Sequence, residues 1–287
     1  DCSYAGQTMN FKFNASDNHA NGYTTSVVNG DYSNNDDSFI IEKEDVTVFY
    51  ASGNEATVNR SAGAAVLMLF INDTDAGHGA YSPSSTVKFN ITVNGSWSDF
   101  LLDGSNTTNA TGYVNYYFNP NCSFQVGRQQ WKGFTEDSCY KTNSSGTYNV
   151  TIYGDVSASP NADNESYYQE GTVTVWINTT DDCGTFINVS AINITLKYNE
   201  SVNYTCGNVI LHNTGNYSCN WTSSQQNPTG YYSVIVFATL PPNYNNVSYT
   251  KTNDFMLLSY VNNNPMLTDE NVYPKGWGTL TNFTVNA

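Results

Sequence analysis

The sequence predicts an all-β protein built from tandem β-sandwich domains. Of its 287 residues, 14 % are aromatic, with 22 Tyr among them, and only 12 % are charged. Strand-forming and turn-forming residues therefore dominate over good helix formers. No stretch of about twelve residues shows the 3.6-residue period of an amphipathic helix, and short alternating runs between turn-rich segments recur instead.

The most regular strands are expected within residues 111–156. Residues 112–118 and 147–153 each alternate in polarity, which is typical of a strand with one buried face. The polar segment between them is predicted to be a long loop. A disulfide between Cys122 and Cys139 would staple that loop, as small extracellular sandwiches with modest cores require.

Four segments are predicted along the chain. Residues 1–43 are expected to form a short β module that another strand completes, and residues 44–155 and 156–260 one sandwich each. Residues 261–287 are expected to form a linker and a strand suited to donation. The strands expected in the two sandwiches are 46–50, 65–71, 86–93, 112–118 and 147–153, then 172–177, 192–198, 208–212 and 231–239.

Three expectations concern the interior and the connection of the sandwiches. Residues 65–71 lack alternation and are expected to form a central strand covered on both faces. The polar residues 157–170 are expected to connect the two sandwiches. Trp176 and Trp221 are the bulkiest candidates for the core of the second sandwich.

Four stretches of the first sandwich resemble a known kind of surface domain. In chain order they read AVLMLFINDTDAG, SSTVKFNITVNG, TNATGYVNYYFNP and GTYNVTIYGDV. This order is similar to the bacterial and archaeal immunoglobulin-like surface domains, the invasin-type repeats, over about a third of the chain. The resemblance implies tandem immunoglobulin-like domains, and the long loop between Cys122 and Cys139 departs from the simple repeat.

The number of N-glycosylation sequons points to an extracellular location. With 41 Asn and 60 Ser or Thr in the chain, chance gives roughly nine N-x-S/T motifs, so the observed number is about two-fold enriched. A surface coated with N-linked glycans is expected, although abundant Asn, Ser and Thr in β-turns would also raise the count. The twenty sequons are at Asn14, Asn59, Asn72, Asn90, Asn94, Asn106, Asn109, Asn121, Asn143, Asn149, Asn164, Asn178, Asn188, Asn193, Asn199, Asn203, Asn216, Asn220, Asn246 and Asn282.

Charge and hydropathy restrict the partners. Ten basic and 25 acidic residues give a formal net charge of −15, which argues against nucleic acid and anionic membranes as partners. The most apolar run, residues 62–71, is too short to cross a bilayer. Since the chain begins with Asp1 and lacks a signal peptide, we expect a mature or trimmed piece of a secreted or cell-surface protein.

The six cysteines fit disulfides better than metal ligands, because no C-x-x-C motif occurs and the three histidines are dispersed. Adjacent pairing predicts a bond between Cys122 and Cys139 and another between Cys206 and Cys219. Cys2 and Cys183 are left unassigned. They either bond to each other, or one of them bonds to a neighbouring molecule.

Catalytic motifs are missing, so no enzyme activity and no cofactor are predicted. Several acidic clusters are weak candidates for binding calcium, since this ion prefers carboxylate, amide and carbonyl oxygens as ligands. The residues concerned are Asp36, Asp37, Asp73 and Asp75, with a further pair at Asp181 and Asp182. Asx-turns at strand ends explain these clusters equally well.

The two ends of the chain carry similar segments. Residues 278–287 align without gaps on residues 6–15 and are identical at five of ten positions. This similarity would arise if the chain were cut from a longer tandem array of similar domains. It would also arise if the last strand were donated to another copy of the chain. The residues of that hypothetical polymer contact are Leu280, Asn282, Phe283 and Val285 against Phe11 and Phe13.

These observations favour an extracellular structural glycoprotein, a subunit or repeat unit of a surface filament, sheath or S-layer that binds copies of itself. The alternative is a cell-surface adhesin, or a carbohydrate-binding module of a larger secreted protein, that recognises other cells or carbohydrate. Residues 125–137, which include Trp131, are the candidate binding loop of that alternative.

Overall fold

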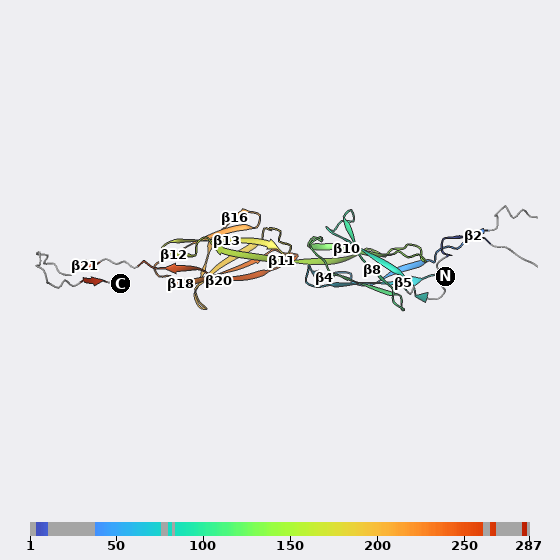
Figure 1. The fold of residues 1–287 in the computed structure, drawn as a ribbon, viewed down its shortest axis with the longest axis horizontal. Helices are drawn as coiled ribbons and strands as arrows, with labels where there is room; N and C mark the ends of the chain where they lie inside the picture. Colours follow the sequence, from blue (N-terminus) through green and yellow to red (C-terminus); the bar gives the residue numbers. More distant parts are fainter. Residues whose placement is uncertain are drawn as a thin grey trace, which may run out of the picture. The chain divides into compact units, whose positions relative to one another are not determined.

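The chain is all-β, as predicted. A computed structural model describes residues 4–10, 38–75, 80–81, 84–260, 265–267 and 283–285, and within these ranges it contains strands but no α-helix. The chain divides into two compact units, Asp1–Tyr153 and Gly154–Ala287. Each unit contains an immunoglobulin-like β-sandwich (Figure 1).

The first sandwich has two sheets. In one sheet, β5 pairs antiparallel with β3, β6 and β9, and the other sheet has the order β4-β11-β10-β7-β8. In this second sheet β4 pairs with β11 in parallel, whereas β11 with β10, β10 with β7 and β7 with β8 pair antiparallel. The strands are β3 (Val46–Ser52), β4 (Ala56–Asn59), β5 (Ala65–Asp73), β6 (Ala80–Tyr81), β7 (Thr86–Thr92), β8 (Phe100–Thr107), β9 (Tyr113–Phe118), β10 (Gly127–Thr135) and β11 (Tyr148–Ala162).

The second sandwich repeats this plan. One sheet has the order β16-β17-β13-β11, and the other has the order β12-β20-β18-β14-β15 with a parallel pairing of β12 and β20. A short early strand that pairs parallel with a late strand is therefore common to both units. The strands are β12 (Ser166–Tyr168), β13 (Thr172–Asp181), β14 (Ala191–Lys197), β15 (Asn203–Thr205), β16 (Gly207–Asn213), β17 (Asn216–Thr222), β18 (Gly230–Thr239), β19 (Tyr244–Asn245) and β20 (Val247–Leu258).

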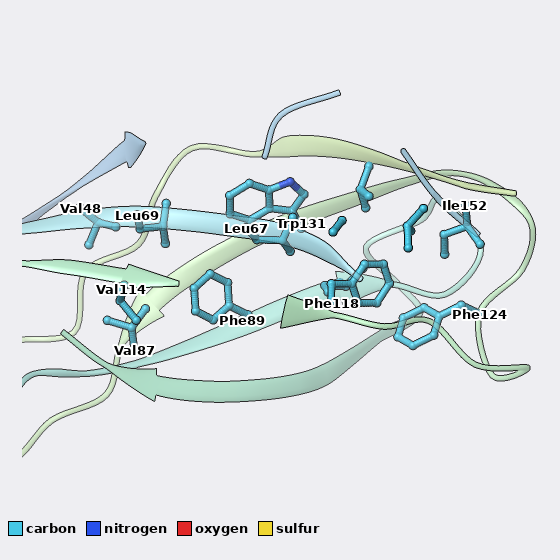
Figure 2. Close-up of a cluster of buried hydrophobic side chains, with 14 of the residues drawn as sticks. Val48, Leu67, Leu69, Val87, Phe89, Val114, Phe118, Phe124, Trp131 and Ile152 are labelled. Carbon is cyan, nitrogen blue, oxygen red and sulfur yellow. The ribbon is translucent and has the colours of Figure 1, made fainter. Parts of the chain in front are cut away.

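Alternating burial places the first core between the two sheets of the first unit. Along β5 the burial alternates from Ala65 onward, with Leu67, Leu69 and Ile71 fully buried. The prediction that residues 65–71 are covered on both faces is therefore wrong, although β5 is a central strand. In Figure 2 the side chains of Leu67, Leu69, Phe89, Phe118 and Trp131 converge between the strands.

The segment between Cys122 and Cys139 is not one long loop, because most of it forms β10. The buried residues of β10 are Gly127, Gln129, Trp131, Gly133 and Thr135. Because several of them are small or polar, the sequence of β10 does not alternate between polar and apolar residues. The buried Gln129 amide is satisfied, accepting hydrogen bonds from the Thr92 hydroxyl at 3.0 Å and from the Gly95 N–H at 2.7 Å.

Residues 157–170 are likewise not an irregular connector. Residues 156–162 of β11 pair with β13, and β12 follows after a short turn. The strand is hard to recognise because its buried side chains include the small Ala158 and Ala162. Pro160 is tolerated because this part of β11 has one strand neighbour, β13, within the described residues.

Two short strand pairs lie near the ends of the chain. β1 (Thr8–Asn10) pairs antiparallel with β2 (Ser38–Ile40) within the segment expected to form a short β module. β21 (Pro265–Leu267) pairs antiparallel with β22 (Phe283–Val285). Each pair forms a two-stranded sheet of its own in the described part of the chain.

Candidate functional site

A polar hollow of about 590 Å³ lies in the second sandwich. The end of β11, the turn that follows it, β12, β18 and β20 all contribute to its wall. The hollow is lined by Asn161, Ala162, Asp163, Asn164, Glu165, Ser166, Tyr231, Lys251, Asn253, Asp254 and Met256. Apart from the sequon at Asn164, sequence motifs did not single these residues out, because they come from three separate stretches of the chain.

A buried carboxylate anchors the base of the hollow. The Asp254 side chain is 1 % exposed, and its Oδ1 lies 2.6 Å from Lys251 Nζ. Its Oδ2 accepts a hydrogen bond of 2.8 Å from the Ala162 N–H. Lys251 Nζ also donates to Asn161 Oδ1 at 2.5 Å, so one ammonium group links β20 to β11.

The turn that follows β11 is fixed by a buried phenol. The Tyr167 hydroxyl donates to the Asp163 carboxylate and accepts a hydrogen bond of 2.8 Å from the Asn164 N–H. Burial, followed by the hydrogen bond to Asp163, raises the pKa of Tyr167 to about 12. The Met256 N–H donates to the Glu165 carbonyl at 2.9 Å, which ties the turn to β20.

The hollow combines carboxylates and amides with one exposed aromatic ring. None of its lining residues is Cys or His, and the Asp254 carboxylate is already engaged by Lys251 and a backbone amide. The rim offers the Asn164, Glu165 and Ser166 side chains, and Tyr231 presents a ring that is 54 % exposed. Polar groups around one exposed aromatic ring are a common arrangement for recognising hydroxyl-rich ligands.

Trp131 does not belong to an exposed binding loop, contrary to the sequence-based expectation. Its side chain is fully buried on β10, and its indole N–H donates to the Gly53 carbonyl at 3.3 Å. The indole ring lies 4.9 Å from the ring of Tyr148 and 6.2 Å from that of Phe89. Trp131 is thus a core residue that a solvent-borne ligand does not reach.

The two tryptophans assigned to the second core differ. Trp221 is 9 % exposed and packs in the core, as expected. Trp176 is 38 % exposed on the outer face of β13, so its assignment to the core is wrong. The β13 register explains this, because the neighbouring Val175 and Ile177 are the residues that point inward.

The acidic candidates for calcium act as turn acceptors where they are described. Asp73 Oδ1 accepts the Asp75 N–H at 3.0 Å, and Asp75 Oδ2 accepts the Asp45 N–H at 2.8 Å. These are the bonds of an Asx-turn and of a strand end. Asp36 and Asp37 lie outside the described residues.

Asp181 and Asp182 lie beside Cys183. Asp181 Oδ1 accepts the Cys183 N–H at 3.0 Å and the Thr185 N–H at 2.9 Å, and Asp182 Oδ1 accepts the Asp155 N–H at 3.1 Å. Because Cys183 is in a disulfide, its sulfur is not available as a thiolate ligand.

The predicted disulfide between Cys206 and Cys219 is present and closes a loop with a sequence separation of 13. Cys122, Cys139 and Cys183 are also disulfide-bonded, so no described cysteine is a free thiol. The predicted bond between Cys122 and Cys139 stays a prediction, and Cys2 lies outside the described residues.

Most described sequon asparagines face solvent on both sandwiches. Asn14 and Asn282 lie outside the described residues. Asn90 is buried, and its Oδ1 makes no hydrogen bond within the described part of the chain, so it is the sequon least accessible to modification. Asn72, Asn149 and Asn216 are half-buried. The exposed ones are Asn59, Asn94, Asn106, Asn109, Asn121, Asn143, Asn164, Asn178, Asn188, Asn193, Asn199, Asn203, Asn220 and Asn246.

The residues of the predicted polymer contact are described only in part. Phe11, Phe13, Leu280 and Asn282 lie outside the described residues. Phe283 and Val285 are in β22 and pair with Leu267 and Pro265 of the same chain. Donation of this strand to another copy would add a partner to β22 or exchange the present one.

Comparison with known proteins shows no matching family and no matching curated protein. A tetra-tandem repeat from the extending region of a large adhesion protein is similar at 16 % identity and a TM-score of 0.33, over 74 % of this chain and 50 % of that chain. A three-domain immunoglobulin segment of titin is similar at 9 % identity and a TM-score of 0.42, over 74 % of this chain and 65 % of that chain. The Escherichia coli adhesin FdeC is similar at 13 % identity and a TM-score of 0.35, over 72 % of this chain and 63 % of that chain.

The chain therefore spans about half the length of the adhesion-protein repeat structure. Its own sheet order and parallel end-strand pairings define its class, a tandem immunoglobulin-like β-sandwich protein. Among the described residues, no helix is long and apolar enough to span a membrane.

Proposed function

We propose that this chain is an extracellular structural glycoprotein whose tandem sandwiches form the repeat unit of a surface filament, sheath or S-layer. The distribution of the sequons supports this most directly, because fourteen of the eighteen described sequon asparagines are exposed and they occur on both sandwiches. Sheet hydrogen bonds and apolar burial hold each domain, and disulfides add resistance to unfolding. Glycans would shield strand edges from indiscriminate pairing.

Glycopeptide mass spectrometry of the secreted chain tests this proposal. Sugar is expected on most of the exposed asparagines and not on Asn90. A secreted chain without any N-linked sugar would contradict the proposal. Expression in a host that glycosylates N-x-S/T motifs is required, since sequon occupancy depends on the host enzymes.

Assembly by strand donation is the proposed route to a polymer. β22 and β21 have one strand partner each within the described residues, and a two-stranded pair is marginally stable by itself. An added strand from another copy would complete such a sheet. Deleting residues 277–287 is expected to abolish polymers in electron micrographs, and unchanged polymers would rule out this contact.

Adhesion is the second candidate function, and the polar hollow beside Tyr231 is the observation that favours it. On a glycan array, Tyr231→Ala should lose binding, whereas Tyr249→Ala should retain it because Tyr249 is an exposed tyrosine that does not line the hollow. Since Asn164 at the rim is itself a sequon, the assay should also use the chain after enzymatic removal of its N-linked sugar, which leaves the rim side chains Glu165 and Ser166 unchanged. Equal binding by the Tyr231 and Tyr249 variants would exclude the hollow as the binding site.

A further inference from the structure

The same short motif occurs on equivalent strands of the two sandwiches. Residues 70–75 read Phe-Ile-Asn-Asp-Thr-Asp and residues 176–181 read Trp-Ile-Asn-Thr-Thr-Asp. The first begins near the end of β5 and the second near the end of β13. In the first sandwich β5 pairs antiparallel with β3 on one side and with β9 on the other. In the second sandwich β13 pairs antiparallel with β11 on one side and with β17 on the other. The motif thus has one structural position in two domains.

The motif places an aromatic ring and a sequon asparagine on the same outer face. Ile71 and Ile177 are fully buried, so the residues on either side of each isoleucine point away from the core. Residues two apart on a strand are separated by about 7 Å along its axis. A sugar attached to the asparagine is therefore within reach of the ring.

In the first sandwich the ring belongs to a row of three. Phe70 is directly opposite Phe49 and Tyr113 in the sheet register, with ring centroids 6.2 Å and 5.1 Å away. Phe49 and Tyr113 are 48 % and 42 % exposed. This row forms an apolar surface beside Asn72.

In the second sandwich Trp176 provides the surface. It is 38 % exposed, and its ring lies 4.9 Å from that of His212. The neighbouring Asn178 is exposed and accepts a hydrogen bond of 2.8 Å from Asn216 Nδ2 through Oδ1. A glycan is attached through the asparagine Nδ2, so this hydrogen bond is compatible with modification of Asn178.

We propose that Asn72 and Asn178 carry N-linked glycans whose first sugar packs on Phe70 and Trp176, an inference that rests on the proposed extracellular glycoprotein. One face of a pyranose ring presents C–H groups, and covering an exposed aromatic ring with them removes apolar surface from water. The chain's own glycan is the occupant that fits, because it is tethered beside the ring in both domains. A glycan in that place would also cover the ring against other proteins.

The test is a double-mutant cycle in the full chain, produced in a glycosylating host and trimmed to a single sugar per site. Thr180→Ala removes the sequon but keeps Asn178 itself, and Trp176→Ala removes the ring. Loss of the sugar is expected to lower Tm by about 3 °C in the wild-type background. The same loss should change Tm by less than about 1 °C in the Trp176→Ala background, because the sugar then has no ring to cover.

Asn203→Gln provides the matched control. Asn203 is an exposed sequon on β15 in the other sheet of the second sandwich, where it pairs with Lys197 rather than with an aromatic residue. Its loss should have the same small effect in both backgrounds. Trp176→Phe keeps an aromatic ring and should restore the dependence of Tm on the Asn178 sugar, even if Trp176→Ala folds poorly.

The outcomes separate this inference from the proposed function. Equal Tm losses in the two backgrounds would overturn the packing of sugar on Trp176 and leave the glycoprotein proposal intact. Sugar on Asn203 but none on Asn178 would likewise overturn the packing and leave the glycoprotein proposal intact. Absence of sugar from all sequons would overturn both.

Discussion

At the scale of single residues, the packing of a side chain rather than its type decides its role. Trp131 lies in a polar sequence context, yet it contacts the buried residues of the first core. Its neighbour Gly133 allows close packing, because a Cβ at that position would lie 2.3 Å from Leu69 Cδ1. The glycine thus lets Leu69 of the facing sheet pack closely against β10.

Replacing Trp131 by Ala should lower the free energy of unfolding by about 3–5 kcal/mol, because it leaves a large cavity in a closed core. Urea denaturation followed by circular dichroism measures this change. Tyr117→Ala is the control, since Tyr117 is 61 % exposed and its loss should cost about 0.5 kcal/mol or less. Equal stability of the Trp131 variant and the wild type would contradict the assignment of Trp131 to the core.

Tyr167 predicts a loss of stability at alkaline pH. Because burial and Asp163 raise the pKa of Tyr167 to about 12, folding favours its neutral form. Its contribution is fully present below the unfolded-state pKa of about 10 and is lost as the pH rises from there toward 12. Urea denaturation between pH 9 and 11.5 should therefore show a smaller decline for Tyr167→Phe than for the wild type. Identical declines would contradict this.

At the scale of elements, the Lys251–Asp254 ion pair lies within β20, and its hydrogen bonds to Asn161 and Ala162 join β20 to β11. Lys251→Met would leave the Asp254 carboxylate buried with the Ala162 N–H as its remaining described partner. The free energy of unfolding should fall by about 1–3 kcal/mol, a range that allows for the partial exposure of Lys251. Chemical denaturation measures this loss.

Adding Asp254→Asn to Lys251→Met should recover part of that stability, because it removes the uncompensated charge while the amide oxygen can still accept from Ala162. Additive losses in the double variant would show that the two side chains act independently.

Alternating runs and apolar runs were both enough to predict several strands. Residues 46–50, 65–71 and 172–177 fall in β3, β5 and β13, and all but Thr147 of residues 147–153 fall in β11. β10 was missed because Gly and Gln occupy buried positions. The part of β11 beyond residue 156 was missed because Ala, Ser and Pro replace the usual branched residues.

At the scale of the whole molecule, the net charge of −15 is the dominant electrostatic feature. Like charges on a compact chain repel one another, and salt screens that repulsion. Raising the NaCl concentration from about 10 mM to about 100 mM shortens the Debye length from roughly 30 Å to 10 Å and should raise Tm by a few degrees. A Tm that falls over this range would show that attractive surface ion pairs outweigh the repulsion.

The sequence by itself determined the fold class, the expectation of tandem domains and the disulfide between Cys206 and Cys219, because period, composition and cysteine spacing are local properties of the chain. Only the tertiary structure decided that Trp131 is buried and Trp176 exposed. It also decided that Asp163, Tyr231 and Asp254 line one hollow. The physical reason is that burial and side-chain neighbours follow from strand register and sheet order, which pair residues far apart in the chain.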